Sequence, residues 1–200
     1  MLEPVAQSIN DFWFGNIEND IVSNEKKESW FKKDPKFDRL LEKKFADYLD
    51  VAFMGAFDRW TNEPEGLCAL IVLLDQFPRN IFRGSYKSFH FDKKALATAN
   101  IAIQKEAFLK VPTAMGYFML MPTMHSESLE TQELGIKSFE KLLDHAPEGS
   151  KAMIQNAIKY AHSHKDIIAK FGRFPHRNEI LERESTPEEL EFLKQPGSSF

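Results

Sequence analysis

The chain has 200 residues, of which 42% are apolar and 12% aromatic, and its 26 basic and 30 acidic side chains give a formal charge of -4. This content is enough for one large core, and no Pro/Gly/Ser-rich linker divides the chain, so a single domain over residues 1–200 is predicted. Neither charge sign forms a long block, which argues against binding to nucleic acid or to an anionic membrane.

Cellular location is predicted from the cysteine content and the apolar runs. The single cysteine, Cys68, lies in an apolar run and cannot form an intrachain disulfide, which fits a reducing compartment. The first residues show no charged-then-apolar signal pattern, and the longest apolar runs are far short of the ~20 residues that span a bilayer. We therefore expect a soluble, cytoplasmic protein without a membrane partner.

The first third of the chain predicts two amphipathic helices. The first runs from about Pro4 to Phe14, with Gly15 as its stop, and residues 16–29 are polar and aperiodic. Asp34 is a suitable cap for a helix whose apolar face begins at Phe37 and continues, less regularly, towards Trp60.

A nearly all-apolar stretch from Leu67 to Leu74 predicts a central helix. It leads into a polar segment, residues 75–83, which we call the first corner; its polar members are Asp75, Gln76, Arg79, Asn80 and Arg83. Proline disfavours helical dihedrals in the residue before it, so Pro78 predicts that the helix ends at Phe77.

The rest of the chain predicts further helices. Asp92 is expected to cap a helix to about Glu106, Pro112 to open one that breaks at Pro122, and a third to run from about Leu129 to His145. Ser150 is expected to cap a long helix that ends at Gly172. Thr186 and Glu189 fit a capping box for a last helix, and residues 195–200 are expected to be mobile.

A second corner, residues 171–183, repeats the chemistry of the first. Phe174-Pro175 and Arg177-Asn178 echo Phe77-Pro78 and Arg79-Asn80. Because both segments are predicted at helix ends, we expect the two corners to meet in space and to line one site. The predicted class is all-α, with seven to nine helices in stacked antiparallel pairs, and no clean 34-residue period marks a repeat array.

Four motifs carry a family resemblance. They are Phe12-Trp13-Phe14-Gly15, Asp75-Gln76-Phe77-Pro78-Arg79-Asn80, Met124-His125-Ser126-Glu127 and Arg173-Phe174-Pro175-His176-Arg177-Asn178. With these motifs the chain resembles the bacterial domain-of-unknown-function 924 family over almost its whole length. The resemblance implies a helical fold similar to tetratricopeptide-repeat proteins and no established activity. One departure is Glu182, where the family is associated with glycine.

The arginines and asparagines of the corners are the predicted ligand-binding residues: Arg79, Asn80, Arg83, Arg173, Arg177 and Asn178. Planar guanidinium groups suit a carboxylate or a phosphate, so a small anionic molecule is the expected partner. The alternative is that these arginines pair with acids such as Asp75 or Glu127 and only fix the helix arrangement.

Candidate catalytic residues are the histidines near the motifs, His125, His164 and His176, with Asp75 or Glu127 as orienting carboxylates. A histidine on an apolar helix face, such as His164, is more often a hydrogen-bonded core residue. No His-Glu-x-x-His spacing and no Gly-rich phosphate loop occur, so neither a metal nor a nucleotide cofactor is expected.

Two functions remain open from the sequence. The first is the binding of a small anionic metabolite, with or without general acid–base catalysis, in a pocket between the two corners and the His125 segment. The second is a peptide-binding or protein-binding adaptor, in which the same polar residues form a structural network. The adaptor requires a long groove, whereas the metabolite requires one compact polar cavity.

Overall fold

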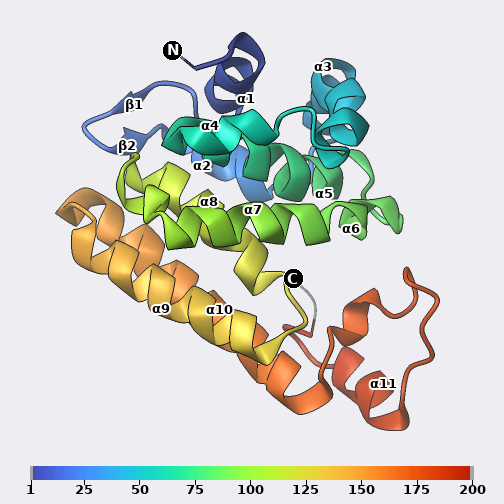
Figure 1. Cartoon of the computed structure of the whole chain (residues 1–200). Coiled ribbons are helices and arrows are strands. Elements are labelled where there is room, and N and C mark those ends of the chain that lie inside the picture. The colour runs from blue at the N-terminus through green and yellow to red at the C-terminus, as the bar shows by residue number, and fades with distance from the viewer. Residues whose placement is uncertain (1, 199–200) are drawn as a thin grey trace.

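A computed structural model describes residues 2–198, and its helices are joined mostly by short turns (Figure 1), which confirms the all-α class. The α-helices are α1 Pro4–Phe14, α2 Asn24–Phe31, α3 Pro35–Phe53, α4 Pro64–Ile71, α5 Phe77–Ile81, α6 Lys87–His90, α7 Asp92–Gln104, α8 Thr113–Met124, α9 Leu129–His145, α10 Glu148–Phe171 and α11 Pro187–Leu193. No helix among these residues is long and apolar enough to cross a membrane.

Short elements complete the described chain. They are the strands β1 Ile17–Glu18 and β2 Ile21–Val22, the 3-10 helices η1 Asp58–Asn62, η3 Ala107–Leu109 and η4 Pro175–Arg177, and the π-helix η2 Val72–Gln76. β1 and β2 pair antiparallel, with Ile17 opposite Val22. This hairpin and α2 occupy the segment that showed no periodic pattern, because a two-residue strand is too short to produce one.

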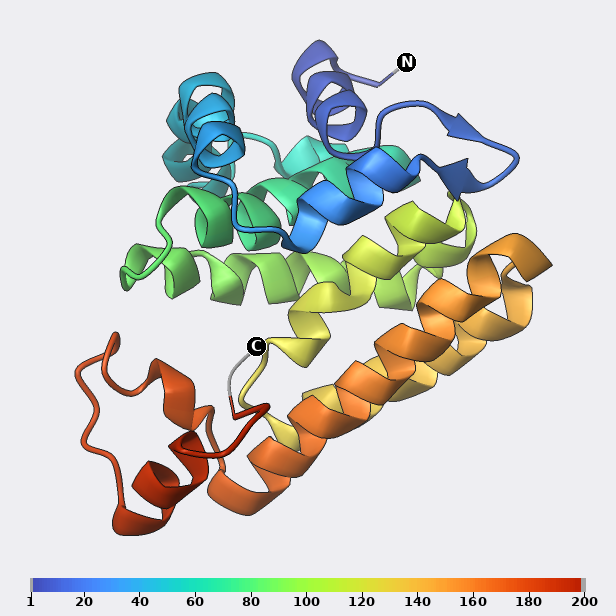
Figure 2. The same ribbon diagram turned by 180° about the vertical axis from the view of Figure 1, so that it is seen from behind.

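The helices stack in chain order from one side of the molecule to the other. α1 and α3 lie against the α4–α5 segment, α7 and α8 lie beyond it, and α9 and α10 form a long hairpin on the far side (Figures 1 and 2). α11 and its flanking loops lie at the end of α10, where Phe174 belongs to a separate small apolar cluster with Ile167 and Ile168.

The central segment is the most deeply buried part of the chain. Every side chain from Leu67 to Leu74 is at most 1% exposed, as predicted for the helix at the centre of the core. The prediction that this helix ends at Phe77 is wrong. Phe77 has helical dihedrals (φ -62°, ψ -43°), and its amide bonds to the carbonyl of Val72, five residues back. The wider π turn makes room for the ring of Pro78 and lets the helix continue.

Three further expectations about helix ends are wrong. α8 continues through Pro122 to Met124, because it is buried all round and Thr123 Oγ1 donates to the Leu120 carbonyl at 2.7 Å. Asp92 is the first residue of α7, and its carboxylate contacts other side chains rather than the helix amides. Ser150 lies inside α10 and donates to Asp20 Oδ2 at 2.7 Å.

Other caps are as predicted. Asp34 accepts hydrogen bonds from the amides of Lys36 and Phe37 at the start of α3, and Thr186 and Glu189 form the capping box of α11. Ser198 is buried, and its hydroxyl donates to the Leu193 carbonyl at 3.1 Å. The expected mobility of residues 195–200 includes residues 199 and 200, which lie outside the described part.

One close helix contact fixes the end of α8. A Cβ at Gly135 of α9 would lie 2.1 Å from Thr123 Oγ1, so only glycine allows this approach. The contact holds α9 against the last turn of α8, from which His125 emerges. The fold thereby sets the position of the residue that ends this helix.

Candidate functional site

The π turn and the end of α8 bring Asp75 and His125 together. Asp75 is fully buried, and its Oδ1 lies 2.7 Å from His125 Nδ1. Because an ionised carboxylate can only accept, Nδ1 carries the proton and Nε2 keeps its lone pair. Gln76 Nε2 donates to the other oxygen, Oδ2, at 2.6 Å.

Opposing effects set the pKa values of this pair. Burial disfavours the charged carboxylate of Asp75, but Arg79 and His125 outweigh it and lower the pKa of Asp75 to about 2. Burial and the nearby charge of Arg79 lower the pKa of His125 below its ordinary value, although Asp75 acts in the opposite direction. The pair is therefore a carboxylate and a neutral imidazole near neutral pH.

Arg79, in α5, is held mainly by Asp92 at the start of α7. Its Nη1 and Nη2 donate to Asp92 Oδ1 and Oδ2 at 2.9 and 3.0 Å, which is the two-bond geometry that suits a guanidinium and a carboxylate. Nη1 also donates to the Asp75 carbonyl at 2.6 Å and lies 3.3 Å from Asp75 Oδ1. Arg79 is thus paired with two nearby acids, Asp92 and Asp75.

Arg177 brings the second corner to the same place. Its Nη1 donates to the His125 carbonyl at 3.0 Å and lies 3.8 Å from Asp92 Oδ2, the oxygen that Arg79 also contacts. Phe89 packs against both guanidinium groups, with ring centroids 5.9 Å from Arg79 Cζ and 4.8 Å from Arg177 Cζ. The predicted convergence of the two corners is therefore confirmed.

The side chain of Arg177 is buried but sparsely bonded. It is 7% exposed, and the ring of Phe174 lies 4.4 Å from its Cζ. Its Nε is buried without a hydrogen-bond partner among the described residues. Burial and repulsion by Arg79 lower the pKa of Arg177 to about 10.

Four of the other predicted ligand-binding residues are engaged in hydrogen bonds. Asn80 donates to the Gln76 carbonyl and accepts from Arg83, and Arg83 also contacts Asp38 at 3.3 Å. Arg173 donates to both carboxylate oxygens of Glu189, at 2.7 and 2.8 Å. Asn178 donates to Ser185 and to Glu189. These side chains have side-chain partners within hydrogen-bond distance, whereas Arg177 donates only to the His125 carbonyl among the described residues.

Glu127 closes the second corner and does not contact His125. Its carboxylate accepts from Arg183 at 2.8 and 3.0 Å and from the Phe174 amide at 2.8 Å. Arg183 also donates to Asn178 Oδ1 at 3.0 Å. Glu182, which precedes it, has φ 53°, a conformation that glycine adopts more easily, as the family pattern implied.

His164 and His176 lie in the same region. His164 Nδ1 lies 2.7 Å from the Tyr160 carbonyl, to which it donates, and the His164 and His176 rings each pack against Phe174. Burial is the main cause that lowers the pKa of each of these histidines to about 4. Both are neutral at neutral pH.

Three residues that contribute to this site were not identified from the sequence. Phe89 gave no motif, and Asp92 had the ordinary pattern of a helix cap, so neither was identified as a partner of the corner arginines. Gln132 was also missed: its Nε2 donates to the Met124 and Ser126 carbonyls at 2.7 and 2.8 Å, which holds both sides of His125. An acid directly following two aromatic residues, as at Asp92, was the only available hint.

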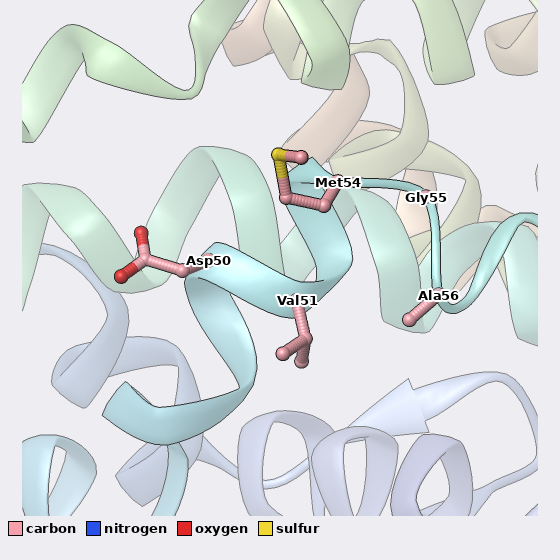
Figure 3. Close-up of a pocket in the computed structure, with 5 residues that line it drawn as sticks. All are labelled: Asp50, Val51, Met54, Gly55 and Ala56. Carbon is pink, nitrogen blue, oxygen red and sulfur yellow. The ribbon is translucent and has the colours of Figure 1, made fainter.

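Two recesses in the surface lie away from this cluster. One of about 460 Å³ is lined by Asp50, Val51, Met54, Gly55 and Ala56, at the end of α3 and the start of the next loop (Figure 3). Another of about 600 Å³ lies beside α1. In residues 2–198, no group of three or more His, Cys, Asp or Glu side chains is arranged to hold a metal ion.

The fold and these contacts define an all-α protein with a buried cluster of arginine, carboxylate and histidine side chains where its two corners meet. Residues 9–197 match the family described as "Bacterial protein of unknown function (DUF924)", and the chain belongs to that family. It is similar to a solved structure, described as a protein of unknown function, ATU0120, from Agrobacterium tumefaciens. The two share 33% sequence identity with a TM-score of 0.80, over 96% of this chain and 97% of that one. A search of curated proteins gave no match.

Proposed function

We propose that this protein binds a small anionic molecule at Arg177, beside the His125–Asp75 pair. The observation that carries the proposal is the bonding state of Arg177. Arg177 is 7% exposed, yet only the His125 carbonyl accepts a hydrogen bond from its guanidinium among the described residues. A buried charge without a full set of partners is costly, and an anion would supply the missing acceptors.

A purely structural arginine in this fold looks different. Arg173 and Arg183 each donate twice to one carboxylate and also to a backbone carbonyl. Arg177 also donates to one backbone carbonyl, that of His125, but its approach to a carboxylate is the 3.8 Å distance to Asp92, whose two oxygens already accept from Arg79. The contrast supports a ligand-binding role for Arg177 rather than for all the corner arginines.

The neighbouring pair supports proton transfer as an additional role. Asp75 orients the His125 ring and fixes its tautomer, so that Nε2 is the basic nitrogen. The His125 side chain is 13% exposed, and its own carbonyl is the group that Arg177 holds. An anion on Arg177 would therefore lie next to a histidine whose Nε2 can take up or release a proton.

Thermal unfolding with a panel of sodium carboxylates, phosphate and sulfate tests this proposal. At about 100 times its dissociation constant, a ligand should add roughly 2.7 kcal/mol to the free energy of unfolding. Arg177→Met keeps the apolar stem and removes the donors, so its response should be lost. Arg39→Met, at an exposed position, is the matched control and should respond as the parent does. Equal responses of the Arg177 and Arg39 variants would contradict the proposal.

The adaptor remains the alternative proposal, and it needs a surface that can hold a peptide. Val51 and Met54 are exposed apolar side chains at the recess shown in Figure 3. All five lining residues belong to one short segment, residues 50–56, so the recess offers only one wall to a peptide. A peptide groove needs contacts from more than one element, and the Arg177 cluster therefore supports the anion more strongly.

A further inference from the structure

The charged groups of the cluster balance one another without any added ligand. It contains three carboxylates and three guanidinium groups: Asp75, Asp92, Glu127, Arg79, Arg177 and Arg183. With His125 neutral, the sum is three minus three, which is zero. Binding of an anion to Arg177 would leave the cluster at minus one for a singly charged ligand and at minus two for a doubly charged one.

An unbalanced charge in a buried site is unfavourable, and the cluster has one group that can correct it. His125 Nδ1 already donates to the Asp75 carboxylate at 2.7 Å, which would stabilise an imidazolium. Protonation of Nε2 would offset one negative charge and would turn Nε2 into a donor. One histidine can compensate for one charge, so a monoanion is the better match.

The other groups that face His125 do not offer the same correction. Arg79 and Arg177 are already charged, Asp75 is held ionised by Arg79 and His125, and Asp92 is paired with Arg79. His164, from α10, and His176, from η4, also act on His125, but burial lowers the pKa of each to about 4. Near neutral pH they stay uncharged.

The geometry of Arg177 also limits the ligand. Two phenyl rings pack against its guanidinium, those of Phe89 and Phe174, with centroids 4.8 and 4.4 Å from Cζ. Nη1 is used by the His125 carbonyl, and Nε has no partner among the described residues. Nε and Nη2 form the other edge of the guanidinium, and together they can donate to two oxygens of one oxyanion.

We infer that this site takes a singly charged oxyanion, a carboxylate rather than a phosphate dianion, and that one proton is taken up at His125 on binding. This inference rests on the proposed anion site. It adds two properties to that site: the ligand carries a single negative charge, and its binding is coupled to the uptake of a proton. Affinity should then fall as pH rises, because the free protein must acquire the proton from solvent.

The test measures binding of acetate, methanesulfonate and sulfate to the full chain by thermal unfolding at constant ionic strength, from about pH 6 to about pH 8. Acetate and methanesulfonate are monoanions of different shape, and sulfate is a dianion. Both monoanions should bind more tightly than sulfate, with affinities that fall up to about tenfold per pH unit. NMR titration of the parent protein should show the pKa of His125 rising when acetate is added. His125→Gln should remove the pH dependence, and circular dichroism checks its folding.

Several outcomes would overturn the inference, and they separate it from the proposed function. Sulfate binding as tightly as acetate, or acetate binding that does not change with pH, would disprove the charge and proton assignment and leave the anion site intact. An unchanged pKa of His125 in the acetate complex would do the same without any variant. No response to any of the three anions, or equal responses of the parent protein and Arg177→Met, would overturn the anion site as well.

Discussion

The two corners carry the same Phe-Pro and Arg-Asn pairs, but their arginines differ in bonding. In the first corner, Arg79 donates to both oxygens of Asp92 and to the Asp75 carbonyl. In the second, Arg177 reaches the same Asp92 only at 3.8 Å and donates to one backbone carbonyl. Asp92 has two oxygens and both are occupied by Arg79. The same residue type is therefore a structural brace at one corner and an incompletely bonded charge at the other.

The difference teaches that the neighbours of an arginine, and not its motif, decide its role. Asp75, which is fully buried, and the partly buried Asp92 raise the pKa of Arg79 despite its burial. In the second corner, burial and repulsion by Arg79 lower the pKa of Arg177 to about 10, although Asp92 and Glu127 act in the opposite direction. Variants at matched positions can measure this contrast directly.

Arg79→Met should have the largest effect. It leaves Asp75 buried without its arginine, and removing one partner of a buried ion pair costs about 3 to 5 kcal/mol. Urea unfolding measures the loss, with the exposed Arg39→Met as a control that should change stability by less than about 0.5 kcal/mol. A loss below about 1 kcal/mol for Arg79→Met would remove the distinction between the corners.

Acid should lower the free energy of unfolding in two separate pH ranges, the higher one set by His164 and the lower one by Asp75. The pKa of His164 lies at about 4 in the folded protein, below its ordinary value of 6.5, so the unfolded chain takes up the proton first as pH falls. Stability is complete above 6.5 and declines towards 4, by about 3 kcal/mol at 1.36 kcal/mol per pH unit. The contribution of Asp75 is lost only between 3.8 and about 2.

Unfolding free energies measured across this range separate the two titrations. His164→Gln should reduce the loss of stability between 6.5 and 4, where His176 still titrates, and leave the lower range unchanged. A parent protein whose stability stays constant over that upper range would show that His164 is not held neutral by burial.

Arg183→Met should have an intermediate effect. Arg183 donates twice to Glu127 and once each to the Phe174 carbonyl and Asn178 Oδ1, so the variant removes several charge-assisted bonds. The acid is only partly buried and can recruit water, which limits the expected loss to about 2 kcal/mol. The loss is measured by urea unfolding. An unchanged free energy of unfolding would mean that the contacts of Arg183 with Glu127 do not stabilise the second corner.

Arg177→Met should have the smallest effect on the ligand-free protein. The variant relieves a buried charge and its repulsion with Arg79, but it also removes the ring contacts and the bond to His125. These terms oppose each other, so the free energy of unfolding should change by no more than about 1 kcal/mol in either direction. A loss of about 3 kcal/mol or more in urea unfolding would assign Arg177 a bracing role like that of Arg79.

Sequence patterns predicted the corners well and their partners poorly. The repeated Phe-Pro and Arg-Asn pairs were enough to predict that Arg79 and Arg177 converge. The partners Phe89 and Asp92 come from the junction of α6 and α7, where local sequence favours an ordinary helix start. Whether all the donors of an arginine have hydrogen-bond partners depends on which acids the fold places beside it. The prediction that Pro78 ends the central helix was wrong for a related reason. A π turn inside the core overrides the local preference of proline.

That π turn makes the spacing of the central helix depend on one residue. Phe77 bonds five residues back rather than four, so Val72–Gln76 holds one residue more than an α-helical turn would. A deletion there would allow a more regular helix, but each residue of an α-helix adds a rotation of about 100°. Asp75 would turn away from His125 while the apolar neighbours stayed in the core. A relative one residue shorter at this point would keep the fold and have no carboxylate on its histidine.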